Sequence, residues 1–375
     1  MVWPKVSIIW LNYNSSHIMD IALKSLDAIA SLNYPSNSVE LIIIDNGSTD
    51  GSFEVVKRFL DKKFIINKKV MRLEKNLGFT GGNNVGYRVR DPESKYIVLL
   101  NNDAIPFPDS LKNLVEYVET RKDVGATQGV ITDMNTGKVD TAGDMLTELL
   151  VAYQLYHYKL PQSVRKSYYI SYADGAYSLY RIDAIKKATG FSDKIFYDEM
   201  FAYFDDSILG LQLWNGEYKI VGCPFVTALH RRSSSFGAVS LQKLYLGTRG
   251  YIALNELCNS IYKKLIRNIF FLSIIRRWAT QLLSSKVLGG RYKLQSHPLE
   301  IWHALCKGYL DGLHWGRMYR SKTLLNIYKA PILRTPLGTS IPMLLTGIGM
   351  DFLRRAYTEK ITKTFENQMH MFIVD

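Results

Sequence analysis

A short polar run, Asn101-Asn102-Asp103, holds residue types that can bind a metal ion carrying a diphosphate. It directly follows Tyr96-Ile97-Val98-Leu99-Leu100, an apolar run that predicts a buried strand. A carboxylate at the C-terminal end of such a strand faces the crevice in which open α/β sheets bind ligands. The side-chain oxygens of Asp and Asn suit Mg²⁺ or Mn²⁺ as metal ligands. Because the same run is common in ordinary turns, its interpretation depends on the residues before and after it.

Three further polar motifs stand near the ends of predicted elements. They are Asn12-Tyr13-Asn14, the run 45–51 (Asp-Asn-Gly-Ser-Thr-Asp-Gly) and the run 76–86, which is rich in Gly and Asn. Turn and helix-capping chemistry accounts for the first motif and for Asp50, but not for Asp45, which is placed to accept hydrogen bonds from a base or ribose. Glycines in the third motif allow a close approach to a ligand and lead into a helix N-terminus, which favours anions. This motif is neither a P-loop nor a dinucleotide fingerprint.

Alternating strand and helix patterns must position these motifs. In the first hundred residues we predict strands at 6–11, 40–44, 70–73 and 96–100 and helices at 17–31, 50–60 and 81–90. This order predicts a parallel, doubly wound sheet. Further on we predict helices at 108–121 and 204–213, strands at 125–131 and 177–180, and two strands around a Cys-Pro turn within 218–229. Because mostly helical patterns follow residue 236, we predict a domain boundary near 236–245.

Taken in order, the four motifs resemble those of glycosyltransferase family 2, and the chain is most similar to its rhamnosyltransferase-like branch. The resemblance covers residues 5–236. It implies the α/β GT-A nucleotide-diphospho-sugar transferase fold over residues 1–236, with a donor half of about 1–130 and an acceptor half of about 131–236. A basic, mostly helical region, residues 237–375, would follow. The implied activity is metal-dependent, inverting transfer of a sugar from a nucleotide-diphosphate donor to a hydroxyl group, with a lipid-linked glycan or cell-surface polysaccharide as the expected acceptor.

The resemblance also implies which residues bind the donor. These are Asn12 and Asp45 at the nucleoside, Asn76 and Gly81 in the donor pocket, and Asn102 and Asp103 at the ribose, diphosphate and metal. The metal would be Mn²⁺ or Mg²⁺. Asn101 stands where the family's Asp-x-Asp signature has its first carboxylate, which weakens the expectation of tight metal binding.

The stretch from 193 to 208 resembles the family's catalytic stretch, in which an Asp that follows a Glu is the general base. Asp206 matches that base, Asp205 replaces the Glu, and Ile208 stands where a further Asp is common. Inverting transfer needs one carboxylate to take the proton of the acceptor hydroxyl as this attacks the anomeric carbon. A neighbouring carboxylate would raise the proton affinity of that base. The alternative is an acidic helix N-cap, which suits Asp205 equally well.

Four more residues are candidates for the site. In relatives, a His at the place of His230 completes the metal site, and neutral imidazole is an acceptable ligand for Mn²⁺; ordinary packing is the alternative. Arg231 and Arg232, which follow it, are candidates to balance the charge of the diphosphate. Asp174, on the acceptor side, would either orient an acceptor hydroxyl or cap a turn.

The chain of 375 residues has a net charge of +13, and most of this charge lies in one region. Residues 260–330 contain 13 Lys and Arg but only two acids, Glu300 and Asp311, which leaves +11 there. Together with several Trp and Tyr, these cations suit an anionic membrane surface. A helical region with a solvated basic face is the alternative, and no nucleic-acid-binding module is recognised. We therefore expect a cytoplasmic enzyme, peripheral on the inner face of the cell membrane.

Other features narrow the class of protein. Three widely spaced cysteines predict neither a disulfide framework nor a metal site, and they suit a reducing compartment. We expect no signal peptide and no membrane span, because no apolar run reaches the required length of about 20 residues. A nucleotidyltransferase would show a Gly-rich basic loop after the first strand, where Asn12-Tyr13-Asn14 stands instead. The alternative of a non-catalytic scaffold on the same fold stays open. The sequence does not indicate the oligomeric state.

Overall fold

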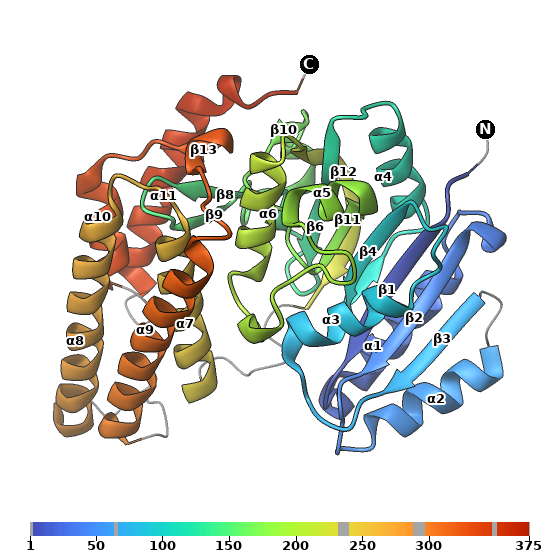
Figure 1. Cartoon of the computed structure of the whole chain (residues 1–375), viewed down its shortest axis with the longest axis horizontal. Coiled ribbons are helices and arrows are strands. Elements are labelled where there is room, and N and C mark those ends of the chain that lie inside the picture. Colours follow the sequence, from blue (N-terminus) through green and yellow to red (C-terminus); the bar gives the residue numbers. More distant parts are fainter. Residues whose placement is uncertain (1–2, 64–66, 232–239, 288–296, 347–350, 375) are drawn as a thin grey trace.

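A mixed β-sheet forms the centre of the molecule, and helices from the C-terminal part of the chain stand together beside it (Figure 1). The computed structural model describes residues 3–63, 67–231, 240–287, 297–346 and 351–374. The strands are β1 (Val6–Asn12), β2 (Val39–Asp45), β3 (Asn67–Arg72), β4 (Tyr96–Asn101), β5 (Ala104–Pro106), β6 (Val124–Asp133), β7 (Val139–Thr141), β8 (Asp144–Thr147), β9 (Ala152–Gln154), β10 (Tyr168–Tyr169), β11 (Tyr177–Arg181), β12 (Lys219–His230) and β13 (Ile332–Leu333). The helices are α1 (Met19–Ala30), α2 (Ser52–Lys63), α3 (Gly78–Val89), α4 (Ser110–Glu119), α5 (Ile182–Thr189), α6 (Asp205–Asn215), α7 (Leu241–Leu257), α8 (Lys263–Val287), α9 (Pro298–Arg320), α10 (Leu337–Thr346) and α11 (Asp351–Gln368).

The main sheet has the order β10-β12-β6-β11-β4-β1-β2-β3. Strands β4, β1, β2 and β3 are parallel neighbours, which confirms the predicted parallel arrangement of the first hundred residues. Strand β11 then enters antiparallel between β4 and β6. In the parallel register Asn12 is opposite Asp45, and Leu11 is opposite Asn101. The motifs that follow these strands therefore meet at one edge of the sheet.

Alternate residues of the parallel strands build two separate cores. Ile8 and Trp10 of β1 face α1, α2 and α4, whereas Ile9 faces the side covered by α3, α5 and α6. These strand residues are completely buried. A strand buried on both faces is read as a continuous apolar run, which is the pattern that the sequence shows for β1, β2 and β4. The result is a doubly wound layer structure.

The C-terminal helices share a third core with the acceptor half. Buried side chains of α7, α8 and α9 pack with Ile208 and Leu211 of α6. A small sheet of order β13-β8-β9 joins the two regions, because β13 comes from the C-terminal region and β8 and β9 from the acceptor half. We predicted a mostly helical C-terminal region, and five helices in the described residues confirm this. The predicted domain boundary near 236–245 stays a prediction, and residues 232–239 lie outside the described residues.

One expectation about the secondary structure is wrong. The segment 218–229 was expected to hold two strands around a Cys-Pro turn, but all of it except residue 218 lies within the single strand β12. The pairing of β12 with β6 shifts in register between Gly222 and Val226, around Pro224. Proline has no backbone N–H to give to a ladder, and an irregularity of this kind accommodates it without ending the strand.

Within the described residues, no helix combines the length and the apolar character that crossing a bilayer requires. All three cysteines are free thiols; Cys223 and Cys258 are buried and Cys306 is half-buried.

Candidate active site

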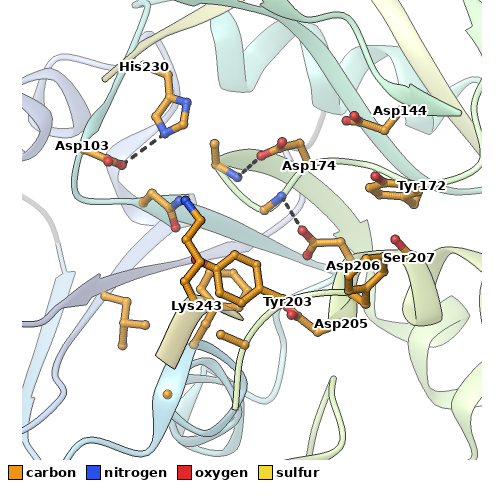
Figure 2. A pocket seen from close by; sticks show the side chains of 18 of the residues that line it. Asp103, Asp144, Tyr172, Asp174, Tyr203, Asp205, Asp206, Ser207, His230 and Lys243 are labelled. Atoms are coloured by element: carbon orange, nitrogen blue, oxygen red, sulfur yellow. Dashed lines mark hydrogen bonds and ion pairs between the residues drawn. The ribbon is translucent and has the colours of Figure 1, made fainter. Parts of the chain in front are cut away.

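A cavity of about 570 Å³ opens at the edge of the sheet where the polar motifs meet (Figure 2). Its walls come from several parts of the chain, among them the turn after β4, residues 174–176 before β11, residues 202–207 at the start of α6, the end of β12 and the start of α7. The lining includes Asn101, Asn102, Asp103, Asp174, Asp205, Asp206, His230 and Lys243. The folded chain thus brings Asp103, Asp206 and His230 to one cavity, as the sequence predicts.

Asp103 and His230 form the polar corner of this cavity. The imidazole Nε2 of His230 lies 3.3 Å from Asp103 Oδ1, and its Nδ1 lies 2.9 Å from Asp140 Oδ2. Burial alone would lower the pKa of His230, but hydrogen bonds to the carboxylates of Asp103 and Asp140 outweigh it and raise that pKa to about 10. As long as no metal is bound, these two carboxylates favour the protonated, imidazolium form of His230.

These contacts would also suit a metal ion that is held by few protein ligands. A metal-binding His ordinarily donates its other ring N–H to a carboxylate, and Asp140 is placed to accept this hydrogen bond from Nδ1. Nε2 is then left for a metal beside Asp103. No three His, Cys, Asp or Glu residues among the described ones are grouped to hold a metal. Oxygen and imidazole ligands fit Mn²⁺ or Mg²⁺ if a diphosphate and water complete the coordination shell.

Asp205 and Asp206 are the first two residues of α6, and both line the cavity. Burial raises the pKa of Asp205 to about 6. Burial, followed by the negative charges of Asp205 and Asp174, raises the pKa of Asp206 well above its ordinary value. The neighbouring carboxylate thus acts in the predicted direction. No side-chain capping bond is present at this helix start, so the N-cap alternative for Asp205 finds no support there.

The carboxylate of Asp206 is only half engaged by the protein. The backbone N–H of Gly175 donates to Oδ2 over 3.4 Å. Within the described chain no group hydrogen-bonds to Oδ1, although that atom is buried. A buried carboxylate oxygen without a partner is costly unless a ligand supplies one. The arrangement leaves Oδ1 ready to accept the proton of a bound hydroxyl group.

Two of the predicted donor-binding residues, Asn12 and Asp45, lie behind the cavity wall. Both are completely buried, and Asn12 Nδ2 donates to Asp45 Oδ1 over 2.7 Å. Asp45 Oδ2 also accepts from the N–H of Ser48 over 3.1 Å. Asn102 Nδ2 donates to Asn12 Oδ1 over 3.4 Å, and Asn102 itself lines the cavity. Asn12 and Asp45 therefore support the lining residue Asn102, and their contact with a nucleoside stays a prediction.

The third motif lines the cavity with Asn76, Gly78 and Phe79 but not with Gly81. Asn76 lines the cavity, and its Oδ1 accepts from Asn46 Nδ2 and from the N–H of Gly78. Gly81 does not belong to the lining; a Cβ there would lie 2.6 Å from Leu77 Cβ, so packing within the helix start explains this glycine. Its role in the donor pocket stays a prediction.

On the acceptor side, Asp174 both caps a turn and lines the cavity. Its Oδ1 accepts from the N–H of Ala176 over 2.8 Å, and its own N–H donates to Gln128. The second carboxylate oxygen is not used in that turn. Asp174 therefore has the structural role that we considered, and its role toward an acceptor stays a prediction.

Several site residues were not found by sequence reasoning. They are Asp140, Asp144, Tyr172, Tyr203, Ser207 and Lys243. Asp140 lies in β7, which was not predicted, and only the pairing of β7 with β6 brings it to His230. Lys243 lies at the start of α7 and extends into the cavity between the Asp103 and Asp205 sides (Figure 2). Of the two arginines after His230, Arg231 is exposed and Arg232 lies outside the described residues.

Comparison with known proteins decides the family. The model of glycosyl transferase family 2 matches residues 7–189. These residues form a family 2 glycosyltransferase domain. The catalytic candidates Asp205, Asp206 and His230 come after the matched range of this domain.

Relatives of this glycosyltransferase domain resemble limited parts of the chain. An uncharacterized glycosyltransferase of Nostoc sp. is 28% identical over 152 residues, which are 40% of this chain and 44% of that protein. TarS of Staphylococcus aureus, a poly(ribitol-phosphate) beta-N-acetylglucosaminyltransferase, is 28% identical over 116 residues, or 31% of this chain and 19% of TarS. The chain thus spans less than half the length of these curated relatives.

Solved structures show that the glycosyltransferase domain has the GT-A fold. Residues 1–349 of Staphylococcus aureus TarS in complex with UDP-GlcNAc superpose with a TM-score of 0.50 at 14% identity, covering 98% of this chain and 92% of that one. GalNAc-T7 with UDP, GalNAc and Mn²⁺ superposes with a TM-score of 0.55 at 11% identity, covering 86% of this chain and 58% of that one. At these identities the likeness concerns the fold alone.

Proposed function

We propose that the protein transfers a sugar, with inversion at the anomeric carbon, from a nucleotide-diphosphate donor to a hydroxyl group of an acceptor. One observation carries the proposal: Asp103, Asp206 and His230 come from distant parts of a glycosyltransferase chain and line one cavity. The nucleotide and sugar ligands of the TarS and GalNAc-T7 structures support a donor of this chemical class.

Asp206 is the general base in this proposal. Its free Oδ1 accepts the proton of the acceptor hydroxyl while the acceptor oxygen forms a bond to the anomeric carbon. The bond between that carbon and the diphosphate oxygen breaks on the opposite face, and the nucleoside diphosphate leaves with the electron pair. The raised pKa makes Asp206 a stronger base than an ordinary carboxylate. Asp205 contributes to this through its charge, and Asp174 is placed to orient the acceptor.

Asp103 and His230 would hold a divalent metal, Mn²⁺ or Mg²⁺, with Asp140 fixing the imidazole. A metal bound there would stabilise the negative charge that develops on the leaving diphosphate. The Mn²⁺ in the GalNAc-T7 structure supports this choice of cofactor. Asn12, Asp45, Asn76, Gly81 and Asn102 remain our candidates for binding or supporting the donor.

Lys243 adds a cation that the sequence did not point to. The lining of the cavity contains five carboxylates, and Lys243 is the only Lys or Arg among these lining residues. A diphosphate entering this negative cavity needs positive charge to balance its own. We therefore propose that Lys243, together with the metal, balances the negative charge of the diphosphate.

The acceptor and the location of the protein belong to the same proposal. The start of α8 and the end of α9 lie together, because Cys258 pairs with Leu325. This end of the helices exposes apolar side chains, with Ile261 75% and Leu324 54% exposed, next to the exposed cations Lys264, Arg320 and Lys322. Apolar and basic groups on one surface suit an anionic membrane. We propose peripheral attachment to such a membrane from the cytoplasm, which would bring the enzyme to a lipid-linked glycan acceptor.

Three of the cations that define the basic region cannot be placed on this surface. Arg291 and Lys293 lie outside the described residues, and the side chain of Lys286 is likewise not described. The membrane proposal therefore depends on the described cations alone.

A donor screen tests the proposed function. We expect one or a few nucleotide-diphosphate sugars to raise the melting temperature when Mn²⁺ is present, because a ligand that binds only the folded form stabilises it. The same donor should then be hydrolysed slowly and transferred faster when a lipid-linked glycan extract is added. Stabilisation by a donor without hydrolysis or transfer would favour a non-catalytic scaffold, and release of pyrophosphate would favour a nucleotidyltransferase.

A further inference from the structure

Three of the four residues before Asp205 and Asp206 have an unusual backbone conformation. Phe201, Tyr203 and Phe204 have φ values of 59°, 72° and 65°. Residues other than glycine rarely adopt this left-handed backbone conformation. Several such residues close together persist only where the surrounding structure imposes the conformation. Because Phe204 immediately precedes Asp205, any relaxation here would move Asp205 and Asp206.

Helix α3 holds this segment from the donor side. The N–H of Thr80 donates to the Phe201 carbonyl over 3.1 Å. A Cβ on Gly78 would lie 2.3 Å from that same carbonyl oxygen, so only glycine allows the approach. Asn84, completely buried, bonds through its side chain to Ile195, Phe196 and Asp198 just upstream. Residues of the Gly- and Asn-rich run 76–86 thus hold the segment 195–201, which leads to Asp205 and Asp206.

Helix α7 contacts the same segment through three of its residues. The guanidinium of Arg249 donates to the Met200 carbonyl. A Cβ on Gly250 would lie 2.7 Å from the Tyr203 carbonyl oxygen and 2.9 Å from Phe204 Cδ2. The ring of Tyr251 meets the ring of Phe204 edge to face, with the ring centres 5.7 Å apart. Three consecutive residues of α7 therefore contact the segment 200–204.

Helix α7 is itself fixed by α9. A Cβ on Gly312 would lie 2.6 Å from the Arg249 carbonyl oxygen, which shows how closely the two helices approach. Tyr245 donates its hydroxyl hydrogen to Asp311 over 2.7 Å. Since the glycines remove the side chains that would separate the backbones, α7 has little room to shift.

We propose that α7, which lies outside the matched family domain, is a positioning element of the active site: Arg249 and Gly250 hold the segment 200–204 and thereby set the place of the Asp206 carboxylate. The proposal rests on the proposed function for the role of Asp206. Arg249 and Gly250 do not touch the substrate and act only through this segment. The C-terminal helices are then required for turnover and not only for attachment to a membrane.

Two glycine variants of the same helix provide the test. Gly250→Ala forces the segment away from α7, whereas a Cβ on Gly247 meets no atom within 4 Å. Both changes replace glycine by alanine inside α7, so their intrinsic effect on the helix is matched. We expect Gly247→Ala to transfer like the wild type. We expect Gly250→Ala to lose roughly tenfold to hundredfold in kcat, because a misplacement of about 1 Å can cost that much. The donor-induced rise in melting temperature should be unchanged.

An arginine series makes the proposal independent of the glycine variant. Arg249→Gln should lower kcat and change the acid limb of the pH dependence of kcat, and Arg249→Lys should restore most of the activity. If Gly250→Ala does not fold, the two Arg249 variants alone test the positioning role of α7. A folded Gly250→Ala or Arg249→Gln variant with the kcat and pH profile of the wild type would overturn the proposal.

Hydrogen exchange separates this inference from the proposed function. Amides of residues 200–206 should exchange faster in Gly250→Ala and Arg249→Gln than in Gly247→Ala, whether or not any donor is turned over. Faster exchange in a protein without transferase activity would support the positioning role and refute the proposed function. Unchanged exchange in both variants would refute the positioning role.

Discussion

The carboxylate of Asp206 has one oxygen bound by the Gly175 N–H and one without a partner among the described residues. We predict that Asp206→Asn keeps donor binding but lowers turnover by about 10²-fold or more, because the amide cannot take a proton from the acceptor. Donor binding is measured by thermal shift and turnover by release of the nucleoside diphosphate. Asp61→Asn, an exposed change on α2, is the control. Near-normal turnover of Asp206→Asn would remove Asp206 from the role of base.

The pH dependence of transfer follows from the Asp205 and Asp206 pair. The base must be ionised, and its pKa is raised by burial and then by Asp205. Transfer should therefore rise with pH through a value well above that of an ordinary carboxyl group. Asp205→Asn removes a neighbouring negative charge, so the acid limb of the kcat profile should move to lower pH. An acid limb that stays in place would show that Asp205 does not act on Asp206.

The same pair links stability to pH. Their folded-state pKa values are raised, so the pair favours folding most below the ordinary carboxyl pKa of 3.8, and this stability is lost as the pH rises through the raised values. Since one pKa unit corresponds to about 1.4 kcal/mol, the change of Asp205 to about 6 corresponds to about 3 kcal/mol at most. Asp205→Asn should consequently melt higher than the wild type at pH 8 but not at pH 4.

In the proposed mechanism, transfer depends on a metal ion that His230 binds and that Asp140 supports by holding the imidazole. EDTA should stop transfer, and Mn²⁺ or Mg²⁺ should restore it. Asp140→Asn should raise the metal concentration that is needed for half-maximal activity by about 10- to 100-fold, because Asp140 orients the imidazole. A metal titration of activity measures this, with Asp20→Asn, an exposed change on α1, as the matched change. Full activity in excess EDTA would refute the metal site.

At the scale of elements, the order and direction of the first strands followed from local patterns. Uninterrupted apolar runs such as residues 41–44 predict strands buried on both faces, and polar groups mark where they end. The antiparallel direction of β11, the pairing of β7 with β6 and the small sheet of β8, β9 and β13 could not be predicted in this way, because they depend on pairing with distant segments. Pairing of this kind depends on tertiary packing and not on the local sequence.

The link between α3 and the segment 195–198 predicts a specific instability. Asn84 satisfies buried backbone groups of that segment, and removing its side chain leaves them without partners. Asn84→Ala should destabilise the protein by about 2–3 kcal/mol. Thermal or urea unfolding measures the loss. Asn113→Ala on α4 is the control, and an equal effect of the two variants would contradict a special role for Asn84.

At the scale of the whole molecule, most of the surplus positive charge and the candidate catalytic carboxylates belong to different regions of the protein. The catalytic carboxylates lie at the sheet edge, whereas most of the surplus cations belong to residues 260–330. Figure 1 shows these helices standing beside the sheet domain, so their outer surface is available to a large partner. This arrangement allows a surface to be engaged while the cavity stays open.

Flotation with liposomes checks the membrane proposal. The protein should bind vesicles that contain anionic lipid, bind neutral vesicles weakly, and dissociate as salt is raised. The double change Arg320→Gln and Lys322→Gln should weaken binding about tenfold or more, since each cation near the surface contributes about 1 kcal/mol. The double change Lys57→Gln and Arg58→Gln on α2 alters the charge equally and should have little effect. An equal loss of vesicle binding in the two double variants would contradict a specific membrane-binding surface and indicate a general effect of net charge.

The sequence by itself determined the family, the strands that carry the polar motifs and the identity of Asp103, Asp206 and His230 as site candidates. Apolar runs and the motifs that end them are local properties, so they can be read without coordinates. Only the tertiary structure placed Asp140 against His230, put Asn12 and Asp45 behind the wall, and brought Lys243, Arg249 and Gly250 to the site. These contacts join residues far apart in the chain through close packing, and no periodicity or spacing in the sequence encodes them.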